Sequence, residues 1–207
     1  MPAQSEPTVT LLLRHGQTPM SVQKRYAGRS DVPLTEIGVL QAAAAKRLAS
    51  AGIGVIVTSP LLRATRTAQE VAEVTGAPVV IDEGFRETDF GAWEGLTFAD
   101  VRQRWPAEVK TWLADSSVPP PGGESLAEVS TRVTEALHRV LADREQQTIL
   151  IVSHVTPIKT LVAAALLAPP AALYRMHLDV AALCEIDWYA DGPAVLRSFN
   201  DTGHLTG

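Results

Sequence analysis

The chain has 207 residues, of which 46% are hydrophobic and 20% are charged, a balance typical of a globular domain and unlike that of a disordered chain. Its formal net charge of −5 gives no overall positive field, which argues against general affinity for nucleic acid. A single cysteine, Cys184, excludes an intramolecular disulfide and a CxxC metal site, and in "AALCEID" it is expected to be a small buried thiol.

The first ten residues, "MPAQSEPTVT", contain no positively charged start followed by an apolar segment, so no signal peptide is expected. The longest apolar stretch, "LVAAALLA", is too short to span a bilayer. We therefore expect a cytoplasmic protein that does not bind a membrane.

In the first part of the chain, apolar runs alternate with helical patterns. Runs of β-branched and aliphatic residues predict buried strands over 8–13, 53–59 and 78–82. Thr35 and Pro60 open two segments with helical spacing of apolar residues, and each segment closes on a glycine. The predicted helices cover residues 35–52 and 60–76.

The region between Phe85 and Gly123 has a looser pattern. Short helices are predicted over 97–105 and 106–115, and the loop that follows is rich in proline and glycine. We interpret residues 85–123 as an insertion that forms a helical lid. Its tryptophans are expected either to line a substrate site or to form a local core: Trp93, Trp105 and Trp112.

The last part of the chain returns to clear strand and helix patterns. A capping box of Ser125 and Glu128 predicts a helix from Ser125 to about Arg144. A buried strand is predicted over 148–153, followed by a helix that begins at Pro157. Two further strands are predicted over 181–189 and 194–200.

Strands that alternate with helices are typical of an α/β sheet covered on both faces. We expect a three-layer α/β/α sandwich with a mostly parallel central sheet and a helical lid insertion. No repeat and no linker divides the sequence, so residues 1–207 are expected to form one domain.

Charged side chains and histidines follow the ends of the predicted strands. Arg14 and His15 come directly after the first strand, Arg63 follows the second, and His154 ends "TILIVSH". A carboxylate, Glu87, lies in the glycine- and aromatic-rich segment "FRETDFGAWEG". Because ligands of open α/β sheets bind at the carboxyl ends of the strands, we expect these five side chains to share one crevice.

These residue types suit phosphoryl transfer. Guanidinium groups bind phosphate through paired donors, a neutral imidazole can attack phosphorus, and a carboxylic acid can protonate the leaving oxygen. Taken singly, each residue also fits an ordinary structural role, such as a histidine bonded to backbone or an arginine on a solvated helix face. Their joint placement after successive strands favours the catalytic interpretation.

Motifs of several other reactions are absent from the sequence. There is no GxxxxGK[ST] or GxGxxG loop for a nucleotide, and no HExxH or His/Asp cluster at the spacing of metal ligands. No GxSxG elbow surrounds Ser125.

Four segments resemble, in the same order, the motifs of the histidine phosphatase superfamily in its phosphoglycerate mutase-like branch. They are "LLLRHGQT", "SPLLRATRTA", "RETDFGAWEG" and "VSHVTPIK". The similarity runs from Val9 to Asn200, nearly the whole chain. It is greatest to alpha-ribazole phosphatases and to acid phosphatase modules that some actinobacteria fuse behind an RNase H domain.

The resemblance implies a phosphatase that forms a phosphohistidine on His15, with Glu87 as proton donor. Arg14, Arg63 and His154 would hold the phosphate, and no metal or organic cofactor would be needed. The resemblance also implies a set of substrate contacts: Gln17, Thr18, Ser21, Ala27, Gly28 and Val155.

Two positions depart from the family pattern. Many relatives carry Asn in place of Ser21, and Gly in place of Val155, so both positions are expected to affect substrate choice. The expected partner is a small phosphorylated substrate, with no nucleic acid bound, and the expected assembly is a monomer or homodimer. Two alternatives stay open: a phosphoglycerate mutase, or a non-catalytic module that binds phosphate or a protein partner.

Overall fold

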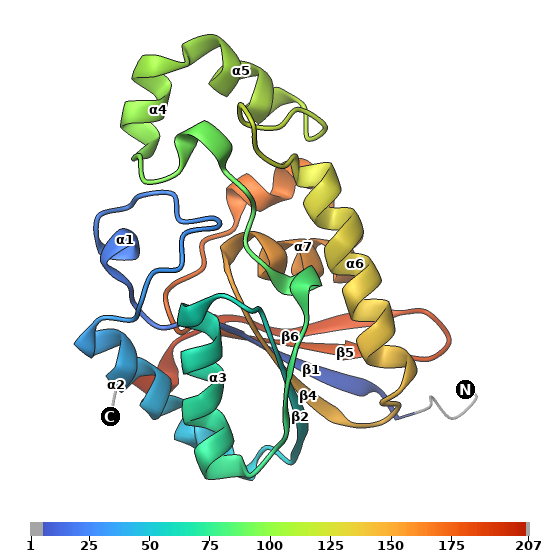
Figure 1. Cartoon of the computed structure of the whole chain (residues 1–207). Helices are drawn as coiled ribbons and strands as arrows, with labels where there is room; N and C mark the ends of the chain where they lie inside the picture. The colour runs from blue at the N-terminus through green and yellow to red at the C-terminus, as the bar shows by residue number, and fades with distance from the viewer. Residues whose placement is uncertain (1–5, 206–207) are drawn as a thin grey trace.

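Six strands form one sheet in the order β3-β2-β4-β1-β5-β6 in the computed structural model, which describes residues 6–205 (Figure 1). Residues 1–5, part of the segment considered for a signal peptide, and 206–207 lie outside the described residues. The strands are β1 (Thr8–Arg14), β2 (Ile53–Thr58), β3 (Val79–Ile81), β4 (Thr148–Ser153), β5 (Leu183–Trp188) and β6 (Ala194–Asp201).

The sheet is mostly parallel, as predicted. β1, β4, β2 and β3 pair in parallel, whereas β5 pairs antiparallel with β1 and β6 pairs antiparallel with β5. Parallel neighbours require crossover connections, and the helices between these strands provide them. The central strands β1 and β4 are therefore hydrogen-bonded on both sides.

Helices cover both faces of the sheet, which confirms the three-layer sandwich. Leu12 of β1 belongs to a core shared with α6 (Leu126–Ala142) and α7 (Val155–Ala165). Leu11 and Leu13 belong to the opposite core, shared with α3 (Leu62–Thr75). Successive side chains of a strand point to opposite faces, so an apolar run without polar residues is what a strand buried on both faces requires.

The segment between β3 and α6 forms a small unit beside the sandwich. It carries α4 (Phe98–Arg104) and α5 (Pro106–Ala114), which Figure 1 shows at the top, apart from the sheet and its covering helices. The predicted pair of short helices is thus confirmed. The unit has its own apolar core, made by Phe90, Trp93, Val101, Val109 and Trp112.

Three predicted helix limits differ from the structure. The helix predicted over 35–52 is α2 (Glu36–Ala44) followed by a 3₁₀ helix, η1 (Ala45–Ser50). α3 begins at Leu62 rather than Pro60, because Asp31 accepts the Leu62 N–H at 2.6 Å. α7 begins at Val155 rather than Pro157, because a carboxylate accepts its first N–H groups. Pro157 fits in the first turn because an N–H at that position would have no partner within the helix.

Short elements without a strong apolar period were missed. These are α1 (Pro19–Val22) and the 3₁₀ helices η2 (Glu83–Phe85), η3 (Gly91–Trp93), η4 (Pro170–Arg175) and η5 (Gly203–Leu205). Cys184 is buried in β5, as predicted, and burial raises the pKa of its thiol. Within residues 6–205, no helix combines the length and the apolar character needed to cross a membrane.

Candidate active site

The carboxyl end of β1 places Arg14 and His15 at the centre of the sheet edge. The His15 N–H donates to the Ser153 carbonyl of β4 at 3.1 Å, and the His15 carbonyl accepts from Ala181 at 3.1 Å. The next residue must be glycine, because a Cβ on Gly16 would overlap the carbonyl oxygen of Gly38. The loop that carries His15 is thus fixed on both sides.

The imidazole of His15 is oriented by its own backbone. Its Nδ1 lies 2.7 Å from the Gly16 carbonyl, and a carbonyl only accepts, so Nδ1 carries the proton. The other nitrogen, Nε2, then keeps a free lone pair and has no hydrogen-bond partner among the described residues. Burial, followed by the charges of Arg14 and Arg63, holds the pKa of His15 well below its usual range. His15 is therefore a neutral, oriented base.

The second histidine, His154, lies beside His15, with 5.1 Å between the ring centroids. Its Nδ1 accepts from Nε of Arg63 at 3.2 Å, which leaves its Nε2 to donate to Oγ of Ser59 at 2.7 Å. Burial, then Arg63, lowers the pKa of His154 well below its ordinary value. Both ring nitrogens are thus occupied and the ring is neutral.

Arg63 is almost completely buried, at 1% exposure, in the first turn of α3. Apart from His154, its guanidinium donates to three carbonyls in the described part of the chain: to Ala27 at 2.7 Å, Ser30 at 2.8 Å and Gly28 at 3.1 Å. Burial is the main cause of its lowered pKa. In this structure Arg63 ties the 27–30 loop to His154.

Arg14, by contrast, keeps donors for a ligand. Its Nη1 donates to the Leu178 carbonyl at 2.6 Å, but its buried Nε has no partner among the described residues. Burial lowers the pKa of Arg14 to about 10, so the group is still a cation near pH 7. A buried guanidinium with an unpaired donor is well suited to an oxyanion.

Glu87 reaches the same place from the segment after η2. Its Oε2 accepts from the N–H of Val155 at 3.1 Å, and its Oε1 from that of Thr156 at 3.3 Å and that of Thr88 at 2.8 Å. The carboxylate therefore occupies the positive end of α7, where first-turn N–H groups have no partner within the helix. These bonds fix the carboxylate beside the cavity.

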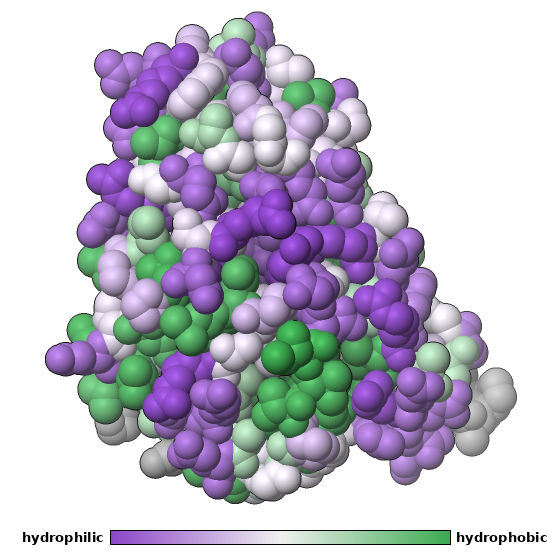
Figure 2. Space-filling view, viewed as in Figure 1, coloured by the Kyte–Doolittle hydropathy of each residue, from purple (hydrophilic) through white to green (hydrophobic). Residues whose placement is uncertain are grey.

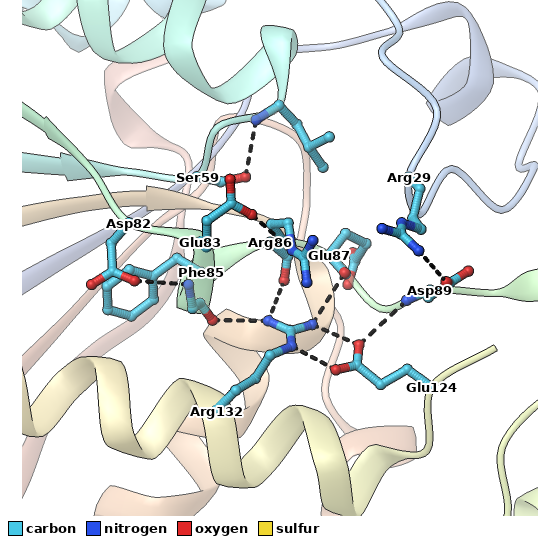
Figure 3. Close-up of polar contacts among 12 residues, drawn as sticks. Arg29, Ser59, Asp82, Glu83, Phe85, Arg86, Glu87, Asp89, Glu124 and Arg132 are labelled. Atoms are coloured by element: carbon cyan, nitrogen blue, oxygen red, sulfur yellow. Dashed lines mark hydrogen bonds and ion pairs between the residues drawn. The ribbon is translucent and has the colours of Figure 1, made fainter.

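Arg132 holds the backbone that carries Glu87. Figure 3 shows its guanidinium pointing from α6 to this segment, where it donates to the carbonyls of Gly84 at 2.8 Å, Arg86 at 2.9 Å and Glu87 at 3.1 Å. The remaining donors bind both carboxylate oxygens of Glu124, at 2.6 and 2.8 Å. All five N–H groups are used. Figure 2 shows hydrophilic residues across the middle of this face of the molecule.

One cavity of about 280 Å³ brings most of the predicted residues together. Of the five predicted catalytic residues, Arg14, His15 and Glu87 line it, whereas Arg63 and His154 are buried and are not among its lining residues. Of the predicted substrate contacts, four line it: Thr18, Ser21, Ala27 and Val155.

The other two predicted contacts, Gln17 and Gly28, do not line this cavity. The Gln17 side chain accepts from Oγ1 of Thr35 at 2.9 Å, and Gly28 lines a neighbouring cavity of about 420 Å³. Ser21 lines the first cavity, but its Oγ is engaged with the backbone of Thr18, at 2.8 and 2.9 Å, in a capping box. These bonds account for the short side chain at this departure from the family pattern.

Aromatic rings form one wall of the cavity. The Tyr26 and Phe90 rings are tilted by 39° with 4.5 Å between their centroids, and Trp112 meets Tyr174 edge-on at 5.4 Å. Trp93 lies between the two pairs, 6.2 Å from Tyr26 and 5.3 Å from Trp112, and is itself fully buried. Of the three predicted tryptophans, Trp112 lines the cavity, while Trp93 and the half-buried Trp105 belong to the local core.

Several lining residues were missed from the sequence: Arg25, Tyr26, Thr156, Lys159 and Tyr174. Lys159 had an available signal, because it lies one helical turn after Val155 and so shares its face of α7. No comparable local pattern marks Arg132, whose carbonyl partners lie 45 to 48 positions away in the sequence. Among the described residues, no group of three or more His, Cys, Asp or Glu is placed to hold a metal ion.

The family model of the histidine phosphatase superfamily (branch 1) matches residues 10–202. The chain belongs to the histidine phosphatase superfamily. The two histidines, the arginines and Glu87 therefore lie in a member of a phosphatase superfamily. Individual curated relatives and solved structures add detail to this family assignment.

Among curated relatives of this superfamily member, the bifunctional protein Rv2228c of Mycobacterium tuberculosis is 48% identical over 205 residues. That alignment covers 98% of this chain but only 56% of the relative, so the chain spans about half of that protein's length. A probable phosphoglycerate mutase of Proteus mirabilis is 34% identical over 204 residues, which cover 94% of each chain.

Solved structures of phosphatases share this superfamily fold. A mycobacterial glucosyl-3-phosphoglycerate phosphatase, solved with VO3, has a TM-score of 0.86 at 31% identity and covers 94% of this chain and 100% of its own. A phosphoserine phosphatase of Entamoeba histolytica has a TM-score of 0.86 at 32% identity, with 96% and 99% covered. A putative alpha-ribazole-5'-P phosphatase of Escherichia coli has a TM-score of 0.84 at 29% identity, with 94% and 97% covered.

Proposed function

We propose that this chain hydrolyses phosphate monoesters through a phosphohistidine formed on His15. The observation that carries the proposal is the hydrogen bond from Nδ1 of His15 to the Gly16 carbonyl, which leaves Nε2 with a free lone pair beside the cavity. An attacking imidazole must be neutral and oriented. Arg14 and Glu87 line the same cavity and supply the two other functions that the reaction needs.

In the first step, Nε2 attacks phosphorus, an N–P bond forms, and the bond from phosphorus to the ester oxygen breaks. The carboxylic acid form of Glu87 gives its proton to the leaving oxygen, so an alcohol departs. Arg14 binds the equatorial oxygens, whose negative charge a nearby guanidinium stabilises in the transition state.

In the second step, water attacks the phosphorus and the N–P bond breaks. The Glu87 carboxylate takes one proton from the water, inorganic phosphate leaves, and His15 returns to its neutral form. Arg63 and His154 are proposed to hold the phosphate together with Arg14; they share a hydrogen bond, and His154 lies beside the His15 ring.

Two finer substrate classes are proposed for this hydrolysis, those of an acid phosphatase and of an alpha-ribazole phosphatase. The alternative within the superfamily is a phosphoglycerate mutase, which must exclude water and return the phosphoryl group to a second hydroxyl. A coupled assay for exchange between 2- and 3-phosphoglycerate separates the mutase from the phosphatase.

Residues 85–123 are proposed to act as the lid of the site. Phe90 and Trp112 of this segment line the cavity, and the segment has its own apolar core, so it can support a closed wall around a substrate. One domain over the whole chain, a cytoplasmic location, a monomer or homodimer, and the lack of nucleic-acid binding stay predictions.

The proposal is tested by hydrolysis of p-nitrophenyl phosphate with the wild type, with His15→Ala, and with His138→Ala as control. His138 is exposed on α6, so its variant should keep wild-type activity. His15→Ala should lose about 10³-fold or more in kcat/KM. The wild type alone should form an acid-labile phosphoenzyme. Undiminished hydrolysis by His15→Ala would falsify the mechanism.

The alternative that the chain is a non-catalytic binding module predicts a different result. The wild type would then bind phosphate or vanadate but would not hydrolyse any ester in a panel of phosphate monoesters. Turnover that depends on His15 excludes that alternative.

A further inference from the structure

Lys159 brings a third cation to a cavity that Arg14 and Arg25 also line. It lies on α7 one turn after Val155, on the face that contacts Glu87, and its side chain lines the cavity. Within the described residues, its one hydrogen bond goes from Nζ to the Leu173 carbonyl at 3.3 Å. An ammonium group has three N–H donors, so two remain available to a ligand.

No carboxylate in the described part of the chain lies within ion-pair distance of Nζ. The side chain is half-buried, and burial is the largest cause of the lowered pKa of Lys159. Glu87 raises that pKa and Arg14 lowers it, so both charges act on the ammonium. An anion beside Nζ would favour the charged form, because an opposite charge compensates for lost hydration.

The position of Lys159 distinguishes it from Arg14. Arg14 is the last residue of β1, directly before His15, and its guanidinium donates to the Leu178 carbonyl. Lys159 is instead held by η4, through Leu173, and the next residue of η4 is Tyr174 of the aromatic wall. Lys159 therefore lines the cavity beside the aromatic wall, where the leaving group would pack, and is close enough to Arg14 and Glu87 for their charges to act on it.

We propose that Lys159 binds a second anionic group, a carboxylate or a second phosphate, carried by the leaving group of the substrate. The aromatic wall of Tyr26, Phe90, Trp112 and Tyr174 packs against the apolar part of the same leaving group. The proposal rests on the proposed function and narrows its substrates. Alpha-ribazole phosphate has no second anionic group, so it should be turned over less efficiently than a carboxylated ring ester.

The test compares phenyl phosphate with 3-carboxyphenyl phosphate, two esters with the same ring that differ in the carboxylate. The readout is the ratio of kcat/KM for the carboxylated ester to that for the plain ester. In the wild type this ratio should be about 10 or more, the value of one charge-assisted contact in a partly buried site. Lys159→Met should lower the ratio about tenfold, chiefly through KM, and Lys159→Arg should restore most of it.

A matched control and two outcomes decide the proposal. Lys110→Met makes the same substitution at an exposed site on α5 and should leave the ratio unchanged. An equal loss on both esters in Lys159→Met would place the lysine on the phosphoryl group, and a wild-type ratio near one would show no second subsite; either overturns the proposal. Failure of the proposed function is distinct, because the wild type would then hydrolyse neither ester.

Discussion

Arg63 donates through Nε to Nδ1 of His154 at 3.2 Å, and this bond sets the tautomer of a histidine that itself lies 5.1 Å from the His15 ring. A proton added to Nδ1 of His154 would face the N–H of a guanidinium. The arrangement therefore keeps His154 neutral, in agreement with the direction of its pKa shift.

Arg63→Lys should disable this support although it keeps the charge. An ammonium cannot replace the planar donors that reach His154 and the carbonyls of Ala27, Gly28 and Ser30 together. We expect kcat/KM to fall by about 10²-fold and the free energy of unfolding by about 2–4 kcal/mol, because buried carbonyls lose their donors. Kinetics and urea unfolding measure both; wild-type values in Arg63→Lys would show that charge alone suffices.

Glu87→Gln tests the proton donor. A glutamine keeps the size of the side chain but has no acidic proton, so the leaving oxygen must depart as an anion. We expect an alkyl phosphate to lose about 10²–10⁴-fold in kcat/KM and p-nitrophenyl phosphate much less, because its leaving group is stable as an anion. Equal losses on the two substrates would contradict the acid role of Glu87.

Arg132→Met should mimic Glu87→Gln without touching the cavity. The guanidinium positions three carbonyls of the segment that carries Glu87, and a small displacement of an acid group costs about 10²-fold in rate. The loss should again be larger for an alkyl phosphate than for p-nitrophenyl phosphate.

The matched control for Arg132 is Arg139→Met, two turns along α6, where an exposed arginine pairs with Asp82 at 3.1 Å. That variant should keep the wild-type dependence on the leaving group. If Arg132→Met slowed both esters by the same factor, the arginine would have a purely structural role.

Acid should destabilise the fold through its two site histidines. The pKa values of His15 and His154 are lowered in the folded state, whereas the unfolded chain titrates near the ordinary value of 6.5. Their contribution is therefore complete above about pH 6.5 and is lost as the pH falls below it, by at most about 1.4 kcal/mol per pH unit for each histidine.

Urea unfolding at pH 7.5, 6.5 and 5.5 measures this loss. Carboxylates also titrate in acid, so the comparison is with His15→Asn, whose free energy of unfolding should fall less steeply between pH 6.5 and 5.5. Equal slopes in the two proteins would mean that His15 has an unshifted pKa.

Much of the fold follows from patterns visible in the sequence. Unbroken apolar runs such as 148–153 identified strands buried on both faces, and the capping box of Ser125 and Glu128 fixed the start of α6. The errors lie where distant groups satisfy the first turn of a helix. α7 starts at Val155 because Glu87, 68 positions away, accepts its N–H, and no local signal contains that information.

The site residues at the strand ends were predictable from the sequence, whereas the tyrosines that line the cavity were not. Arg14 ends β1 and His15 follows it directly, so the direction of the chain alone brings them to the sheet edge. Arg63 also follows a strand, but its burial depends on the carbonyls of the 27–30 loop. Tyr26 and Tyr174 come from segments without a repeating pattern, and only the tertiary fold brings them together at the cavity.

β1 has hydrogen-bonded neighbours on both of its edges, β4 on one side and β5 on the other. His15 is therefore attached to one of the most constrained strands of the molecule, whereas the wall facing it consists of side chains from loops and short helices. Substitutions in that wall leave the hydrogen bonds between the strands in place, because none of the aromatic side chains belongs to the sheet. During evolution, substitutions in this wall can therefore change which substrates are bound, while the residues that carry out the reaction stay the same.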